Sequence, residues 1–154
     1  MYEFTGFSDC KAGLMVKMKG KRDARGALVA HSITLNDRAE EAVIEDSIQS
    51  IDYEQNTLRI LDCEIAIPNA IQIKDLQRNA IGLQDLKAGN RVKLIGTYLV
   101  SSPLVPEKIK MKETGGFNVA ELQGVIERID FEKKTLEVLG FVVVVDERTA
   151  YYGG

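Results

Sequence analysis

Hydrophobic and polar residues alternate in short runs along most of the chain, and this period of two is typical of β-strands rather than helices. Two long runs share one pattern that slips by one residue, as a bulged strand would; they are Ile44, Asp46, Ile48 and Ile51, and Leu122, Gly124, Ile126 and Ile129. We expect further strands at residues 15–19, 27–35, 57–60, 64–67, 91–95, 104–111, 135–138 and 141–145, and short helical turns at residues 7–12 and 83–88. The chain is therefore predicted to be all-β.

The strand pattern repeats because the sequence repeats. "IDYEQNTLRIL" (residues 51–61) returns as "IDFEKKTLEVL" (residues 129–139) at an offset of 78. Residues 6–20 match residues 82–96 at eight of fifteen positions, at an offset of 76. We place the two extra residues of the second copy in the loop at residues 97–103. A period this long exceeds the ~20–50 residues of a solenoid repeat and indicates a small domain used twice.

Turn chemistry accounts for the repeated phrase. Asp52 and Asp130 each end a strand at the first position of a loop, where an aspartate accepts hydrogen bonds from the amides of the turn. Asn56 suits a left-handed conformation later in the first loop, and Lys134 adopts one less readily. The phrase is predicted to be a hairpin, and it requires no catalytic role.

Each copy contains five short strands, a helical turn between the third and fourth strands, and glycines at the corners. This pattern is typical of a small OB-like β-barrel. Residues 68–80 are expected to be a connector that only the first copy has. We therefore predict two five-stranded OB-like barrels in one chain.

One of these barrels is predicted to be continuous, at residues 42–113, and the other to be split between residues 2–37 and 118–152. Each half of the split barrel is too small to be stable alone. We expect the halves to pair with each other in a monomer, with Met1 close to Gly154. The alternative is that they pair between two chains in a swapped dimer.

The second copy, "LQGVIERIDFEKKTLEVLGFVVVVDERT", together with "GLQDLKAGNRVKLIGTY", resembles an uncharacterised bacterial domain family with an OB-like barrel. The residues that carry the resemblance are Gly124, Ile129, Asp130, Thr135, Leu136, Asp146, Thr149, Asp85, Leu86, Lys87, Gly89 and Val92. The family implies tandem copies in cell-envelope or secreted proteins, and therefore a periplasmic or extracellular setting. Its motifs are structural, so it implies no catalytic residues. The first copy departs from the pattern at Asp46, Asp62 and Pro68.

Composition narrows the classes of function. A net charge of −3 and a pI near 5.3 argue against a general polyanion binder, although a local patch is compatible with them. No apolar run approaches the ~18 residues of a membrane span, and the acidic start "MYEFTGF" predicts no signal peptide. Cys10 and Cys63 stand where the other copy has Leu86 and Phe141, so we expect both to be reduced thiols.

The sequence shows no arrangement typical of a catalytic or metal site. His31 is the single histidine, and we expect it on the surface of a strand. Carboxylates at the hairpin tips, such as Asp52 with Glu54, offer too few oxygens for calcium, and a solvated turn is favoured. We expect no catalytic residues, no metal and no cofactor.

Charge is unevenly distributed along the chain. Residues 11–25 carry six basic side chains against one acidic one, and residues 40–54 carry six acidic side chains and no basic one. Lys108, Lys110 and Lys112 add a basic strand in the second copy. The two clusters are solvated faces, or they are opposite patches that meet within or between molecules. The candidate binding residues are Lys17, Lys19, Lys21, Arg22 and Tyr98.

Three functions remain open, and we favour the first. It is a non-catalytic binding or assembly module of a bacterial envelope or secreted protein, with an unknown protein or polymer partner. The second is binding of single-stranded nucleic acid or another anionic polymer through the candidate residues. The third is an enzyme with a site between the barrels, for which the sequence nominates no residues.

Overall fold

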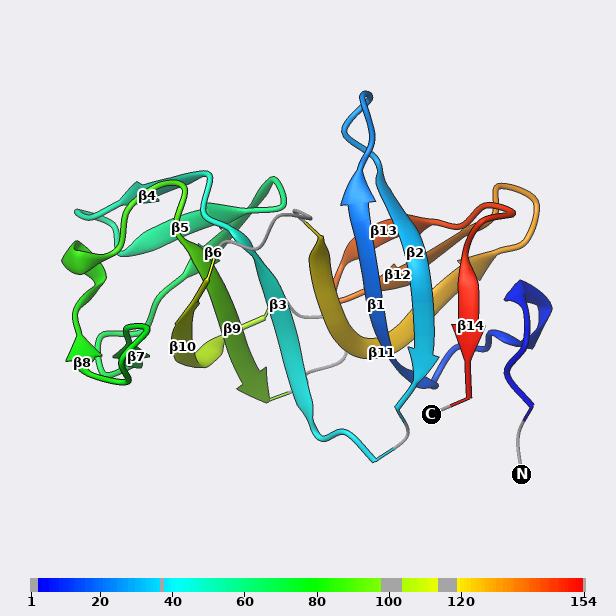
Figure 1. Ribbon diagram of the computed structural model, residues 1–154, viewed down its shortest axis with the longest axis horizontal. Coiled ribbons are helices and arrows are strands. Elements are labelled where there is room, and N and C mark those ends of the chain that lie inside the picture. The colour runs from blue at the N-terminus through cyan, green and yellow to red at the C-terminus, as the bar shows by residue number, and fades with distance from the viewer. Residues whose placement is uncertain (1–2, 37, 98–103, 114–118, 154) are drawn as a thin grey trace.

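The computed structural model describes residues 3–36, 38–97, 104–113 and 119–153, and these form an all-β fold (Figure 1). The elements are η1 (Phe7–Asp9), β1 (Met15–Arg22), β2 (Leu28–Leu35), β3 (Glu41–Ser47), β4 (Ser50–Asp52), β5 (Thr57–Ile60), β6 (Cys63–Ala66), β7 (Gln72–Lys74), β8 (Ala80–Ile81), η2 (Leu83–Asp85), β9 (Arg91–Thr97), β10 (Pro106–Lys112), β11 (Ala120–Asp130), β12 (Thr135–Val138), β13 (Phe141–Val144) and β14 (Ala150–Tyr152). The predicted fold class is confirmed. The two helical turns are single 3₁₀ turns, shorter than expected.

Five strands from both ends of the chain close into a barrel. β11 pairs with β12, β12 with β13, β13 with β2, β2 with β1, and β1 again with β11. The pairing of β13 with β2 is parallel and the others are antiparallel. In Figure 1 the N-terminal strands in blue lie beside the C-terminal strands in orange and red. Met18, Ile33, Leu122, Leu136 and Val143 fill the interior and are almost fully buried.

The remaining strands repeat the same pairings. Val16 lies opposite Gly124 in the barrel, and the equivalent residue Val92 lies opposite Asp46. The parallel pair of β14 with β2 likewise has its counterpart in the parallel pair of β7 with β10. The repeat in the sequence is therefore a repeat of strand pairing and register.

The register corrects the position of the two extra residues. Val16 lies opposite Leu35, and Val92 lies opposite Met111, so the offset of 76 holds on both sides of the loop at 97–103. Residues 98–103 lie outside the described part of the chain. The offset becomes 78 only at Ala120, the first residue of β11, which is equivalent to Ala42. The extra residues therefore lie between β10 and β11, and the expected placement was wrong.

The expectation that residues 68–80 form a connector peculiar to the first copy was also wrong. They contain β7 and the first residue of β8, and β14 occupies the equivalent place in the second copy. Only three residues, Gln72 to Lys74, pair with β10. A strand this short has too few alternating positions to be recognised from its own pattern.

The two units differ in the pairing of β8 with β7, which has no counterpart among the described residues of the barrel, and in a second pairing that leaves one edge open. In the barrel, Leu28 and Val29 at the start of β2 pair with β13. Their equivalents, Leu104 and Val105, precede β10, and among the described residues β6 pairs only with β5. Pro106 follows directly, and proline is confined to edges and bulges of sheets because it has no amide hydrogen. The second unit is therefore left open between β6 and β10.

Strands β11 and β3 join the units edge to edge. Leu122 lies opposite Ile44, and these two residues are equivalent in the repeat. Because the pairing is antiparallel, a local two-fold axis passes between them. Both side chains are fully buried in one hydrophobic cluster that extends through both units. Whether residues 42–113 and the split unit fold independently stays a prediction, and Met1 and Gly154 lie outside the described residues.

The predicted turn chemistry is confirmed. The Asp52 Oδ1 atom accepts hydrogen bonds from the amides of Glu54 and Gln55, each at 3.0 Å. The Asp130 carboxylate makes the same pair of hydrogen bonds to its own turn at the same distances. Asn56 and Lys134 both adopt left-handed conformations, with φ of 54° and 55°. The turn therefore imposes this conformation on lysine as well as on asparagine.

Both cysteines are free thiols. Cys10 is buried in the core, where burial and then the charge of Asp9 raise its pKa to about 11. Cys63 is half-buried at the start of β6, and burial raises its pKa as well. Both shifts keep the thiols protonated at neutral pH, which suits hydrophobic packing better than nucleophilic chemistry.

Candidate functional site

A row of charged side chains crosses six neighbouring strands on the outer face of the molecule. Strand register places them directly opposite one another in the order Lys19 (β1), Glu121 (β11), Glu45 (β3), Lys93 (β9), Lys110 (β10) and Lys74 (β7). Directly opposite residues point to the same side of a sheet. The two glutamates therefore lie at the junction of the units, with lysines on both sides.

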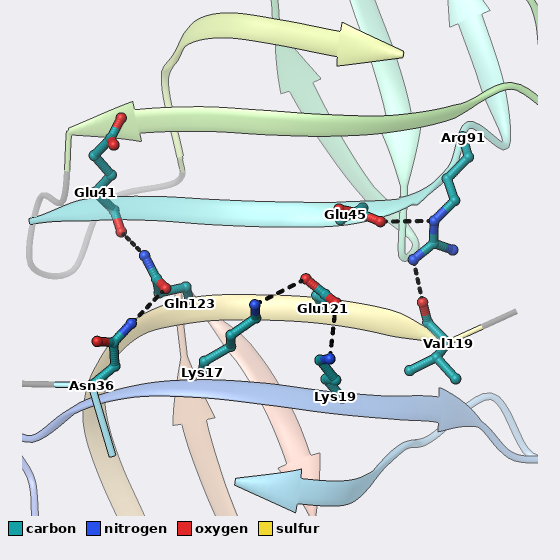
Figure 2. Close-up of polar contacts among 9 residues, drawn as sticks. All are labelled: Lys17, Lys19, Asn36, Glu41, Glu45, Arg91, Val119, Glu121 and Gln123. Carbon is teal, nitrogen blue, oxygen red and sulfur yellow. Dashed lines mark hydrogen bonds and ion pairs between the residues drawn. The ribbon is translucent and has the colours of Figure 1, made fainter. Parts of the chain in front are cut away.

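The glutamates at the centre of the row are neutralised. Figure 2 shows Glu121 between Lys17 and Lys19, whose Nζ atoms each lie 3.6 Å from its carboxylate oxygens. Glu45 accepts a hydrogen bond from the Nε atom of Arg91 at 2.9 Å. The basic cluster at residues 11–25 is thus partly neutralised by Glu121, and the acidic cluster at residues 40–54 by Arg91, so each cluster finds its partner outside the other.

Arg91 is the most connected side chain at this junction. Its guanidinium also lies 3.8 Å from the Asp46 carboxylate and donates a hydrogen bond to the carbonyl oxygen of Val119. It thereby links β9 to β3 and to the start of β11. Burial raises the pKa of Asp46, and the hydrogen bond from Ser47 and the nearby Arg91 charge oppose this shift.

Amide side chains make a second set of links across the junction. Asn36 donates from its side chain to the Gln123 Oε1 atom at 3.0 Å, and Gln123 donates to the carbonyl oxygen of Glu41 at 2.8 Å (Figure 2). This chain of hydrogen bonds connects the end of β2 to β11 and β3. The two units are therefore held at a defined angle, and the charged row runs across both.

Beyond the junction, the row becomes a face of lysines that form no ion pairs within the described residues, although Lys93 lies opposite Glu45. This lysine face consists of Lys74, Lys93, Lys108, Lys110 and Lys112 on β7, β9 and β10. Within the described residues, none of the five ammonium groups forms an ion pair. Lys110 lies directly opposite Lys93 on one side and Lys74 on the other. Like charges in opposed positions destabilise a sheet, so this arrangement needs an explanation other than stability.

A groove of about 880 Å³ runs along the lysine face, and its lining carries five cations and four carboxylates. The cations are Lys74, Arg78, Lys93, Lys110 and Lys112, and the carboxylates are Glu45, Asp75, Glu113 and Glu121. Lys108 borders a smaller hollow beside it. Among the described residues, no aromatic side chain lines either depression. Three of these carboxylates already have partners: Glu121 pairs with Lys17 and Lys19, Glu45 pairs with Arg91, and Asp75 accepts hydrogen bonds from the amides of Gln77 and Asn79.

The candidate residues from the sequence are only partly brought together. Lys17 and Lys19 share Glu121. Arg22 lies beyond the bulge between Lys19 and Gly20 and pairs with Asp62. Lys21 is exposed on the same strand, and Tyr98 lies outside the described residues. These assignments stay predictions, although the structure gives three of the four described cations an acidic partner.

Sequence reasoning noted Lys108, Lys110 and Lys112 but missed Lys74 and Lys93. The sequence does not show which strands pair with each other, and Lys74 and Lys93 belong to the lysine face only because β7 and β9 flank β10. His31 is exposed on β2, as expected. Within the described residues, no group of three or more histidine, cysteine, aspartate or glutamate side chains is arranged to hold a metal ion.

No protein-family model, curated protein or solved structure matches the chain. The described residues contain no helix with the length and apolar character needed to cross a membrane.

Proposed function

We propose that the protein is a non-catalytic binding module whose lysine face engages an anionic polymer. The observation that carries the proposal is the alignment of Lys93, Lys110 and Lys74 on three adjacent strands, where none of them forms an ion pair within the described residues. A polymer with regularly spaced phosphate or sulfate groups would relieve the repulsion among these lysines and release counterions from both surfaces. A periplasmic or extracellular setting belongs to the same proposal and rests on the family resemblance alone.

The geometry of the lysine face suits contact with a charged backbone. Neighbouring strands are ~4.8 Å apart, and alternate residues along one strand are ~6.7 Å apart. The five ammonium groups therefore form a grid that several consecutive anionic groups can contact at once. Stacking of bases needs aromatic platforms, and none lines the described grooves. Binding should depend on charge density rather than on base identity.

Salt-dependent titration tests the proposal. We would titrate the protein with polyphosphate and with oligothymidylate at several salt concentrations and follow binding by calorimetry. The triple variant Lys74→Gln, Lys93→Gln and Lys110→Gln should weaken binding at least about tenfold and reduce the salt slope by about 2, at ~0.7 for each lost contact. Removing opposed like charges should not destabilise the sheet.

The matched control is the double variant Lys17→Gln and Lys19→Gln, because Glu121 neutralises these lysines in the free protein. It should bind both polymers nearly as well as the unsubstituted chain. A larger loss in the control than in the triple variant would move the site to β1, as the sequence predicted. Preference for oligothymidylate over polyphosphate at equal charge would favour nucleic-acid recognition with base contacts. Absence of binding to either polymer at low salt would end the proposal.

A further inference from the structure

The edge of β6 that has no partner strand among the described residues is a second feature in which the two units differ. Its equivalent, β13, is paired on both edges, with β12 and with β2. Among the described residues, β6 pairs only with β5. An exposed strand edge presents unpaired amide and carbonyl groups, and it is a template for pairing with another chain. The comparison between the units shows what kind of partner fits there: a parallel strand such as the start of β2.

The backbone groups that face this edge can be assigned. Ile67 donates its amide to the Asn56 carbonyl at 2.8 Å, which extends the β5 ladder by one residue. Pairing groups alternate along an antiparallel strand, so Ile65 and Cys63 also face β5. The amide and carbonyl groups of Glu64 and Ala66 therefore face away from β5. Their equivalents in β13 face β2.

None of the described segments pairs with this edge. A Cβ atom on Gly96 would lie 2.3 Å from the Val105 carbonyl oxygen, and one on Gly20 would lie 2.2 Å from the Val29 carbonyl oxygen. Val105 therefore sits against β9 in the same way that its equivalent sits against β1. The difference between the units is the separation of β6 from this segment. A cleft of about 950 Å³ lies there, with Ile65 and Leu104 among its lining residues.

The walls of the cleft define the chemistry of its occupant. The apolar part of the lining includes Leu61 and Leu139, which occupy equivalent hairpin turns with φ of 51° and 53°. The lining carries four carboxylates, Asp62, Glu64, Glu127 and Glu137, and one cation, Arg128. Arg22 pairs with Asp62, and Arg128 lies 4.0 Å from Glu137. Glu64 and Glu127 form no ion pair within the described residues, although Arg59 lies opposite Glu64 on β5.

We propose that this cleft binds an extended segment of a partner protein, which adds a strand parallel to β6 and alternates apolar with basic residues. Main-chain hydrogen bonds to Glu64 and Ala66 would supply the affinity, as in other cases of strand addition. Apolar side chains would pack against the apolar part of the lining, and basic ones would meet Glu64 and Glu127. The site is independent of the lysine face, which would repel such a segment.

The probe is a nine-residue peptide of alternating valine and lysine, with a valine and glutamate peptide of the same length as its matched control. Binding would be followed by amide resonances and hydrogen exchange of the full chain. The basic peptide should slow exchange at Glu64 and Ala66 at least about tenfold and leave Ile65 nearly unchanged. The acidic peptide should have no effect at β6.

Two variants complete the test. Ala66→Pro removes one amide from the open edge and keeps the ladder to β5, so it should weaken binding at least about tenfold. If that variant does not fold, the double variant Glu64→Lys and Glu127→Lys serves instead. It should bind the acidic peptide more tightly than the basic one. Three results would overturn the proposal: no response at β6, binding that neither variant alters, or amides of Glu64 and Ala66 already as protected in the free protein as those of Val142 and Val144. The last result would mean that the chain's own segment closes the edge.

Discussion

Alanine in place of Gly20 or Gly96 is expected to destabilise the protein strongly, because these glycines allow two strands to approach closely. They are equivalent residues in β1 and β9, each next to a bulge in the pairing with the following strand. A Cβ atom added to Gly20 would lie 2.2 Å from the Val29 carbonyl oxygen, and one added to Gly96 would lie 2.3 Å from the Val105 carbonyl oxygen. Ordinary contact begins at 3.4 Å. The strands would have to separate by about 1 Å at a position where neither neighbour is a flexible side chain.

The expected loss of unfolding free energy follows from this geometry. Overpacking a well-packed region costs ~1–3 kcal/mol, and displacement of backbone places the effect at the upper end of that range. Replacing glycine by alanine also restricts the unfolded chain, which offsets ~0.4–1 kcal/mol. We therefore expect Gly20→Ala and Gly96→Ala each to lose about 2 kcal/mol.

Urea unfolding followed by circular dichroism measures the loss, since the chain has no tryptophan. Gly6→Ala is the matched control, because nothing lies within 4 Å of its added Cβ atom and its φ of −164° is ordinary extended backbone. The control should be as stable as the unsubstituted chain or slightly more stable. Equal midpoints for Gly20→Ala and Gly6→Ala would show that the bulge tolerates a side chain and that the close approach is not a constraint.

Two further substitutions test local interactions. Asp52→Ala and Asp130→Ala each remove two hydrogen bonds to turn amides, so each should cost about 0.5–2 kcal/mol in thermal or urea unfolding and leave binding unchanged; loss of binding at an unchanged melting temperature would instead make the hairpin part of a site. Asp46→Asn should stabilise the protein at pH 7, because burial raises the pKa of Asp46 above its usual 3.8 and the unfolded chain therefore ionises more readily than the folded one. The ionised Asp46 carboxyl therefore lowers the free energy of unfolding more as pH rises through its raised pKa. Below pH 3.8 the carboxyl is protonated in both states, so the two proteins should become equally stable. A constant difference in stability from pH 3 to pH 7 would contradict the assignment.

Features that depend on short stretches of chain could be predicted from the sequence. Asp52, Asp130 and Asn56 identify their hairpins because side chain and turn lie within a few residues. The two repeated phrases, at offsets of 76 and 78, identified the duplication. The duplication in turn led to the prediction that the two ends of the chain pair with each other. By contrast, β7 is three residues long and pairs with a strand more than 30 residues away, so its own pattern carried too little information.

The charged surface could not be predicted in the same way. A count along the chain grouped Lys17 and Lys19 with Lys21, but Glu121, about one hundred residues later, neutralises the first two. Lys74 and Lys93 are isolated in the sequence, but each lies directly opposite Lys110 in space because β10 lies between their strands. The register that aligns six strands depends on the bulge positions and on the junction of β11 with β3, and neither is visible in the spacing of charges.

The differences between the two units indicate where the chain has kept features that the fold does not require. Position for position, Lys74, Lys108, Lys110 and Lys112 have the uncharged equivalents Tyr152, Ser32, Thr34 and Asn36, although the strand pairing is the same. The open edge of β6 likewise has a closed equivalent in β13. The two units can be compared directly because they share one fold. The closed unit shows that neither the lysine face nor the open edge is needed for the strand pairings that both units have. The lysine face and the open edge of β6 both belong to the same unit, and they lie on surfaces of opposite charge. This arrangement favours the interpretation that this unit recognises partners and that the closed barrel supports it.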